Sequence, residues 1–190
     1  MKWSSYRQIF FINEEELQMS KKALLIIPPE RFNEDELFQP KAELESNGID
    51  VTIASTKTGE IIGDYEGKAT AEVIFSDVFA SDYDVVSVIG GSGTNDHLWE
   101  NKELQDYLKQ AYTNKVLVTG ICAGAVTVAK TGLLNGREAT CYPVDVQKDQ
   151  LKANKVTYVE KHVVAHDDII TGDGPDGAKE FGEALVKALS

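Results

Sequence analysis

The sequence has few cysteines, few basic residues and no long apolar run. Its 190 residues include only two cysteines, Cys122 and Cys141. This excludes a disulfide framework and favours a reducing compartment. The 19 basic residues against 31 acidic ones give a net charge of −12, which argues against a nucleic acid or an anionic membrane as partner. No segment approaches the roughly 18 consecutive apolar residues of a membrane-spanning helix. We therefore expect a cytoplasmic protein with no nucleic-acid or membrane partner.

The chain length suits one domain with a substantial hydrophobic core. Residues 1–20 are predicted to be an N-terminal extension, because Met19 stands directly before the first convincing strand, as an initiator methionine would. A short apolar patch in this segment is followed by Glu14–Glu16, which makes it a poor signal peptide. The remaining residues, 21–190, are expected to form one α/β domain.

Apolar runs alternate with helical patterns along the rest of the chain. The runs predict strands at 23–27, 51–54, 84–89 and 116–118, and the helical patterns follow Asn33 and cover 98–112, 123–130 and 177–189. Residues 57–80 are typical of a small β-hairpin insertion, and residues 138–171 of short strands around Pro143 and a helical turn. Such alternation predicts a flavodoxin-like three-layer α/β sandwich, with a mainly parallel sheet and helices on both faces.

The segment Gly120-Ile-Cys122-Ala-Gly124 has the spacing of a nucleophile elbow, with cysteine in place of serine. Cys122 is expected in the sharp turn between a buried strand and a helix. The helix N-terminus offers unpaired N–H groups and partial positive charge, which lower the pKa of a thiol. The alternative is structural, because free cysteine is also among the most frequently buried residue types.

Three strand ends offer a set of reactive groups, since sites in open α/β sheets form beyond the carboxyl ends of the strands. They supply the Cys122 thiol, the Glu36 carboxyl group and the backbone N–H groups of Gly91 and Ala123 as oxyanion donors. Glu36 could instead be a first-turn acid that only stabilises its helix dipole.

Other kinds of site find little support in the sequence. Gly90-Gly-Ser-Gly93 lacks the dinucleotide-binding spacing and no Walker pattern is present, so no cofactor is expected. His162 and His166 are four residues apart in a strand-like segment, where that spacing does not converge on a metal ion, so no metal is expected either.

From about Lys21 to Leu189 the chain resembles the DJ-one/ThiJ/PfpI superfamily, whose fold is similar to that of class I glutamine amidotransferases. The matching segments run in order along the chain: 32–40 around Glu36, the 89–91 glycine loop, the 121–124 elbow, 133–137, Pro143, and 170–175 with Glu180 and Phe181. The resemblance implies a reactive Cys122, a facing Glu36 carboxyl group, and backbone donors at Gly91 and Ala123. It also implies a homodimer or higher homo-oligomer.

Two departures from the family pattern concern histidine. The protease-like branch carries histidine directly after the cysteine, where this chain has Ala123, and another branch carries it before the later proline, where this chain has Tyr142. Tyr142 and His97, which follows the glycine loop, are therefore the candidate accessory residues. Without a Cys–His pair, the thiol is a weaker nucleophile for amides.

The expected function is a cofactor-independent, cysteine-dependent enzyme acting on small reactive carbonyls, as the glyoxalase-type and deglycase-type activities of the resembling family imply. Cys122 would add to an aldehyde such as methylglyoxal, and Glu36 would carry the proton. One alternative is a redox-sensing or stress-protective protein that acts through oxidation of Cys122. Another is a PfpI-type hydrolase of amides or peptides. Cys141 is expected to be structural, with a resolving or disulfide role left open.

Overall fold

The computed structural model describes residues 19–190 of the chain. The predicted N-terminal extension falls almost entirely outside these residues, so the boundary at residue 20 stays a prediction. No helix within the described range is long and apolar enough to cross a bilayer.

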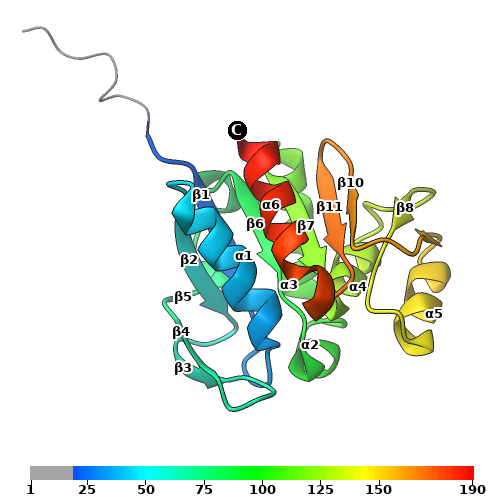
Figure 1. Cartoon of the computed structure of the whole chain (residues 1–190), viewed down its shortest axis with the longest axis horizontal. Helices are drawn as coiled ribbons and strands as arrows, with labels where there is room; N and C mark the ends of the chain where they lie inside the picture. Colours follow the sequence, from blue (N-terminus) through cyan, green and yellow to red (C-terminus); the bar gives the residue numbers. More distant parts are fainter. Residues whose placement is uncertain (1–18) are drawn as a thin grey trace, which may run out of the picture.

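A seven-stranded sheet forms the middle layer (Figure 1). The strand order is β10 (Val163–Ala165), β11 (Ile169–Gly172), β7 (Leu117–Ile121), β6 (Val85–Val88), β1 (Lys22–Ile26), β2 (Asp50–Ser55) and β5 (Val73–Ile74). Every neighbouring pair is parallel except β10 and β11, which are antiparallel. The predicted mainly parallel α/β sandwich is therefore confirmed.

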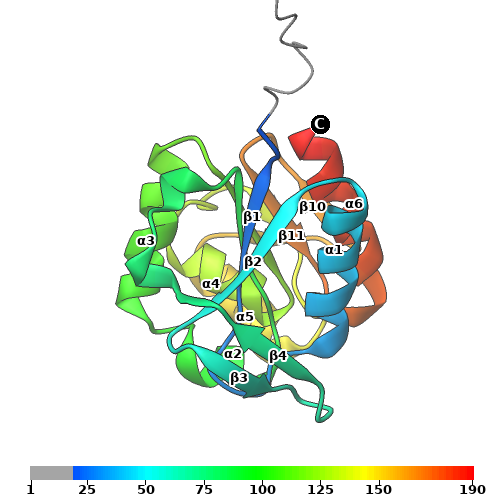
Figure 2. The same cartoon turned by 90° about the vertical axis from the view of Figure 1, so that its left-hand side faces the viewer.

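Helices cover both faces of the sheet (Figure 2). The longer helices are α1 (Glu34–Ser46), α3 (Lys102–Thr113), α4 (Ala123–Lys130), α5 (Asp145–Ala153) and α6 (Ala178–Leu189). Helices α1 and α6 lie side by side on one face, whereas α3 and α4 lie on the other. The helix predicted over 98–112 starts later, because Asn101 caps α3 by accepting a hydrogen bond from the Leu104 N–H. A short helix α2 (Ser92–His97) precedes it.

Two small sheets stand apart from the main one. Strands β3 (Gly59–Ile62) and β4 (Lys68–Ala71) form the predicted antiparallel hairpin. Strands β8 (Glu138–Ala139) and β9 (Thr157–Tyr158) form a short parallel pair. The helical turn expected after Pro143 is the longer helix α5. The hairpin and α5 both matter for function, because residues at their ends reach the carboxyl edge of the main sheet.

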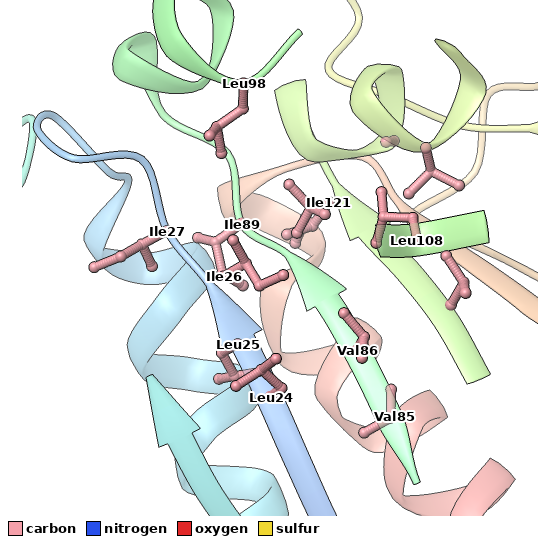
Figure 3. Packing of buried hydrophobic residues seen from close by; sticks show 14 of the residues in the cluster. Leu24, Leu25, Ile26, Ile27, Val85, Val86, Ile89, Leu98, Leu108 and Ile121 are labelled. Carbon is pink, nitrogen blue, oxygen red and sulfur yellow. The ribbon is translucent and has the colours of Figure 1, made fainter. Parts of the chain in front are cut away.

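The hydrophobic core fills both sides of strands β1 and β6 (Figure 3). Leu24, Leu25, Ile26 and Ile27 are fully buried, as expected for a central strand that helices cover on both faces. Strand β2 pairs with one edge of β1, and the chain later returns to place β6 along the other edge of β1. The order therefore reverses between β1 and β6, and this reversal opens a crevice at the carboxyl ends of the two strands.

Candidate active site

Cys122 occupies the turn between β7 and α4. Its backbone has φ 56° and ψ −123°, a conformation that costs a non-glycine residue on the order of 1–3 kcal/mol. The glycines on either side permit it: a Cβ atom on Gly120 would lie 2.5 Å from the Gly124 carbonyl oxygen, and one on Gly124 would collide with the Val88 carbonyl oxygen. The Cys122 N–H donates to the Gly172 carbonyl oxygen over 2.9 Å, which ties the turn to β11. The sequence-predicted elbow is thus present in the structure.

Glu36 projects from the first turn of α1 into the protein and is completely buried. Asn33 fixes the turn: its side chain accepts the Glu36 N–H over 3.2 Å, and its own N–H donates to the Gly90 carbonyl oxygen over 3.0 Å. A Cβ atom on Gly90 would collide with Glu36 Oε2 and lie 2.9 Å from the Cys122 Cβ. The carboxyl group and the thiol therefore meet on either side of a glycine that has room for no side chain.

Neither carboxyl oxygen of Glu36 has a hydrogen-bond partner among the described residues. Burial raises the pKa of Glu36 to about 8, and the nearby Cys122 thiol and Gly90 N–H offset this only in part. The Asp64 and Asp173 carboxylates raise the pKa further. Glu36 is therefore mainly protonated at neutral pH.

The Cys122 side chain differs from the expected low-pKa thiol. Cys122 is only 8% exposed, and burial raises the pKa of its thiol, as does the charge of the neighbouring Glu36. The Gln147 side chain and the Ala123 N–H act in the opposite direction. The Ala123 N–H, at the start of the helix, lowers the pKa of the thiol as expected, but desolvation outweighs it. Because the two acids are adjacent, they titrate as a pair, and the first proton lost leaves one negative charge for both.

A cavity of about 230 Å³ opens onto the sulfur and the carboxyl group. Residues from six parts of the chain line it: Asn33, Glu36, Asp64, Tyr65, Gly91, Ser92, Asn95, Cys122, Tyr142, Gln147 and Pro175. A larger hollow of about 630 Å³ lies at the amino edge of the sheet, beside Lys21 and Asp168, but neither cysteine lines it. We therefore assign the candidate site to the smaller cavity.

The structure brings together most of the residues singled out from the sequence. Glu36, Gly91, Cys122 and Tyr142 line the cavity, and the Ala123 N–H lies at the Cys122 sulfur. Tyr142 is at the rim, 42% exposed, with its ring against Gly174. The roles of Gly91 and Ala123 as oxyanion donors stay predictions.

His97 does not lie at the cavity. Its Nε2 is 2.8 Å from Glu30 Oε1, in an exposed cluster that also contains Arg31 and Asp96. The position after the glycine loop suggested that His97 could turn toward the cleft, but the Glu30 carboxylate holds the ring at the surface. The other histidines are similarly engaged: His162 Nδ1 is 2.7 Å from Asp173 Oδ2, and His166 Nε2 is 2.9 Å from the Glu138 carbonyl oxygen.

Several cavity residues were missed from the sequence. Asp64 and Tyr65 come from the turn of the β3–β4 hairpin, which Glu34 holds in place by accepting the N–H groups of Tyr65 (2.8 Å) and Gly67 (2.9 Å). Gln147 comes from the first turns of α5. The helical turn after Pro143 was the only available signal for Gln147, and the hairpin residues carried none.

The cavity is acidic. Glu36 and Asp64 contribute two carboxyl groups, and no lysine, arginine or histidine of the described chain lines it. The Asp64 carboxylate accepts hydrogen bonds from the Ser92 N–H (3.0 Å) and the Ser92 hydroxyl group (2.5 Å). Within residues 19–190, no group of three or more His, Cys, Asp or Glu residues could hold a metal ion. The arrangement therefore offers a nucleophile, a carboxyl group for proton transfer and neutral hydrogen-bond donors.

A buried thiol on a strained strand-to-helix turn, with an unpartnered carboxyl group facing it, defines a cysteine-elbow α/β protein. The family model described as DJ-1/PfpI matches residues 21–188, and the chain belongs to this family. It is 36% identical over 178 residues to the protein MJ0967 of Methanocaldococcus jannaschii, covering 93% of this chain and 87% of that one.

Three further comparisons concern structure and activity. The crystal structure of a ThiJ/PfpI domain protein from Brachyspira murdochii superposes with a TM-score of 0.85 at 28% identity, covering 90% of this chain and 96% of that one. The Caenorhabditis elegans protein DJR-1.2, named as a glutathione-independent glyoxalase, is 28% identical, with 89% of each chain covered. YraA of Bacillus subtilis, whose name proposes a cysteine protease, is 29% identical, covering 90% of this chain and 99% of that one.

Proposed function

We propose that this protein converts small, uncharged reactive aldehydes, such as methylglyoxal, through covalent addition of Cys122. The observation that supports this most directly is the buried, unpartnered Glu36 carboxyl group facing the sulfur. A carboxyl group whose pKa is raised to about 8 can both accept and donate a proton near neutral pH. The glyoxalase name of the relative DJR-1.2 agrees with this chemistry.

The reaction needs no external oxidant. In the reacting form the acid pair carries one negative charge on Glu36, and the Cys122 sulfur forms a C–S bond with the aldehyde carbon while the carbonyl π electrons move to the oxygen and the thiol proton passes to Glu36. Glu36 then returns this proton to the oxyanion, giving a neutral hemithioacetal. The Ala123 and Gly91 N–H groups stabilise the developing oxyanion. The Glu36 carboxylate then takes the proton from the former aldehyde carbon and delivers it to the adjacent carbonyl carbon, while the hydroxyl proton passes to the former carbonyl oxygen. One carbon is thereby oxidised as its neighbour is reduced. Water cleaves the resulting thioester, which releases the hydroxy acid and restores the thiol.

The acidic lining supports an uncharged substrate. A carboxylate-bearing aldehyde such as glyoxylate would meet Asp64 and an ionisable Glu36 without a compensating cation in the cavity. Amide or peptide hydrolysis, as the name of YraA suggests for that protein, is less supported. An amide is a weaker electrophile than an aldehyde, and no histidine of the described chain lines the cavity to form a Cys–His pair. Redox sensing is less supported because burial raises the pKa of the thiol.

The test is steady-state turnover of methylglyoxal and glyoxylate by the wild type, Cys122→Ser and the matched control Cys141→Ser. Cys141 is buried and its Sγ contacts the Tyr142 carbonyl oxygen, outside the cavity lining. We expect turnover of methylglyoxal in preference to glyoxylate, loss of activity in Cys122→Ser, and activity close to wild type in Cys141→Ser. Equal turnover by the wild type and Cys122→Ser would exclude the proposal.

A further inference from the structure

The Gln147 side chain is hydrogen-bonded to the Cys122 sulfur. It lies on α5, is 5% exposed, and its Nε2 donates to Cys122 Sγ over 3.6 Å, an ordinary distance for a hydrogen bond to sulfur. A buried amide side chain is costly unless its donors and acceptor find partners. In this position the partners are the sulfur and the backbone of the Tyr142 segment.

The chemistry of its partners fixes the orientation of the Gln147 amide. Its Oε1 accepts the Tyr142 N–H over 3.1 Å, and a backbone N–H group can only donate. The oxygen must therefore face Tyr142, so the NH₂ group faces Cys122. An amide turned the other way would oppose two donors at Tyr142 and place an acceptor against the sulfur.

The two side chains at the sulfur differ in what they can do with a proton. Glu36 can exchange a proton with Cys122, whereas an amide can neither accept nor release one near neutral pH. Gln147 can only stabilise negative charge through its N–H groups. Hydrogen bonds to charged groups contribute more than those between neutral groups, so this donor favours the charged sulfur over the neutral thiol.

We propose that Gln147 is a catalytic residue that stabilises the negative charge on Cys122 Sγ as the sulfur loses its proton and attacks. The side-chain oxygen of Gln147 accepts a hydrogen bond from the Tyr142 N–H. Tyr142 stands before Pro143, where one branch of the resembling family has histidine. Gln147 thus supplies a fixed donor without a second proton-transfer group. The proposal rests on the proposed function only for the identity of the electrophile, because the same charge develops when the sulfur reacts with any alkylating agent.

The experiment measures the rate of alkylation of Cys122 by iodoacetamide from pH 6 to pH 10, followed by mass spectrometry of the Cys122 peptide. Gln147→Met keeps an unbranched side chain of similar length without the donor. We expect its pH profile to move up by about one unit, or about a tenfold lower rate on the rising part of the curve. Gln150→Met, the same substitution at a half-buried position of the same helix, should follow the wild-type profile.

A Gln147→Met profile that coincides with those of the wild type and Gln150→Met would overturn the proposal. If thermal unfolding shows that Gln147→Met is not folded, Gln147→Glu provides the same test. It keeps an acceptor for the Tyr142 N–H and brings a second carboxyl group to the sulfur, so its profile should also move to higher pH. A Gln147→Glu profile at or below that of the wild type would overturn the proposal.

Alkylation separates this proposal from the proposed function. A protein that alkylates as expected but does not turn over methylglyoxal would retain the role of Gln147 and lose the aldehyde reaction. A protein that turns over methylglyoxal with unchanged alkylation in Gln147→Met would retain the reaction and lose the role of Gln147. If both the aldehyde reaction and the role of Gln147 are correct, kcat/KM for methylglyoxal should fall in Gln147→Met by about the same factor as the alkylation rate.

Discussion

Glu36 and Asp168 are acidic residues at opposite ends of the parallel sheet, and their surroundings differ in almost every respect. Asp168, just before β11, accepts hydrogen bonds from Arg137 Nη1 (3.1 Å) and Nη2 (2.5 Å) and from the Tyr112 hydroxyl group (2.9 Å). Its side chain is 40% exposed. Glu36, in the first turn of α1, is completely buried and has no partner for either oxygen in the described part of the chain.

The difference appears in the pKa values. The Arg137 guanidinium lowers the pKa of Asp168 from 3.8 to about 2, whereas burial raises the pKa of Glu36 from 4.5 to about 8. Asp168 is thus ionised throughout the physiological range and contributes to stability. Glu36 is destabilising as an anion, and a group of this kind at a cavity is a candidate for proton transfer. Asp168 has a charged partner and we expect it to be structural, whereas Glu36 has none and we expect it to be reactive. Substitutions at the two positions test this difference.

The largest expected effect is on activity. Glu36→Gln removes the proton-transfer group and should lower kcat/KM for methylglyoxal by roughly 10²–10⁴-fold. Asp168→Asn, at the other edge of the sheet, should leave kcat/KM close to the wild-type value. Steady-state kinetics of the two purified variants checks both outcomes. Equal losses in the two variants would show that the buried Glu36 carboxyl group is no more important for turnover than Asp168.

The second prediction concerns stability and has the opposite sign at the two carboxyl groups. Between pH 4.5 and 8 the folded protein keeps a proton on Glu36 that the unfolded chain has lost, so the free energy of unfolding falls as pH rises through this range. Glu36→Gln should lack this decline and be more stable than the wild type at pH 7, by on the order of 2 kcal/mol. Urea unfolding at pH 5, 7 and 8.5 measures the difference. A variant with the wild-type pH dependence would contradict the assignment.

Asp168→Asn should lower the free energy of unfolding at pH 7 by a smaller amount, on the order of 1 kcal/mol, since the partly exposed ion pair is screened by solvent. The lowered pKa means that this contribution is complete above about pH 4 and is lost as pH falls toward 2. The difference between variant and wild type should therefore shrink between pH 4 and pH 2. Arg137→Met is the matched partner change, and a double-mutant cycle would show whether the two residues are coupled.

The smallest effect is expected at His97. Its ring pairs with the exposed Glu30 carboxylate, away from the cavity, so His97→Gln should change kcat/KM by less than about twofold. The same kinetic assay provides the measurement. A large loss would show that His97 reaches the cavity after all and would extend the set of proton-transfer groups beyond Glu36.

Much of the fold could be predicted because its strands carry unmistakable patterns. The buried run in β1 and the runs in β6 and β7 are continuous and apolar, as parallel strands covered on both faces require. The boundary between α2 and α3 could not be predicted. The apolar pattern continues through Leu98, and the helix starts later only because Asn101 caps α3 in the folded chain.

The site was predictable where its groups follow strands and not where they come from elsewhere. The elbow spacing indicated Cys122, with burial as its structural alternative. The first-turn position of Glu36 also fits a helix-dipole role, so its place opposite the sulfur was expected mainly from the family resemblance. Gln147 is beside the sulfur only because the 140–147 segment folds back over the carboxyl edge of the sheet. Asp64 lines the cavity only because the β3–β4 hairpin folds over the same edge. The raised pKa of the thiol was missed because burial depends on neighbours that the sequence does not place.

The Glu34 carboxylate joins the hairpin turn to the helix that carries Glu36, two residues further on. The wall of the cavity that contains Tyr65 is therefore anchored to the same helical turn as Glu36, the proposed proton-transfer group. Enlarging the cavity for bulkier aldehydes by changing α1 would disturb both at once. A change in the length of the turn between β3 and β4 would also disturb this anchor, so redesign of substrate range is better directed at the Tyr65 side chain, because Glu34 holds only the backbone N–H groups of Tyr65 and Gly67.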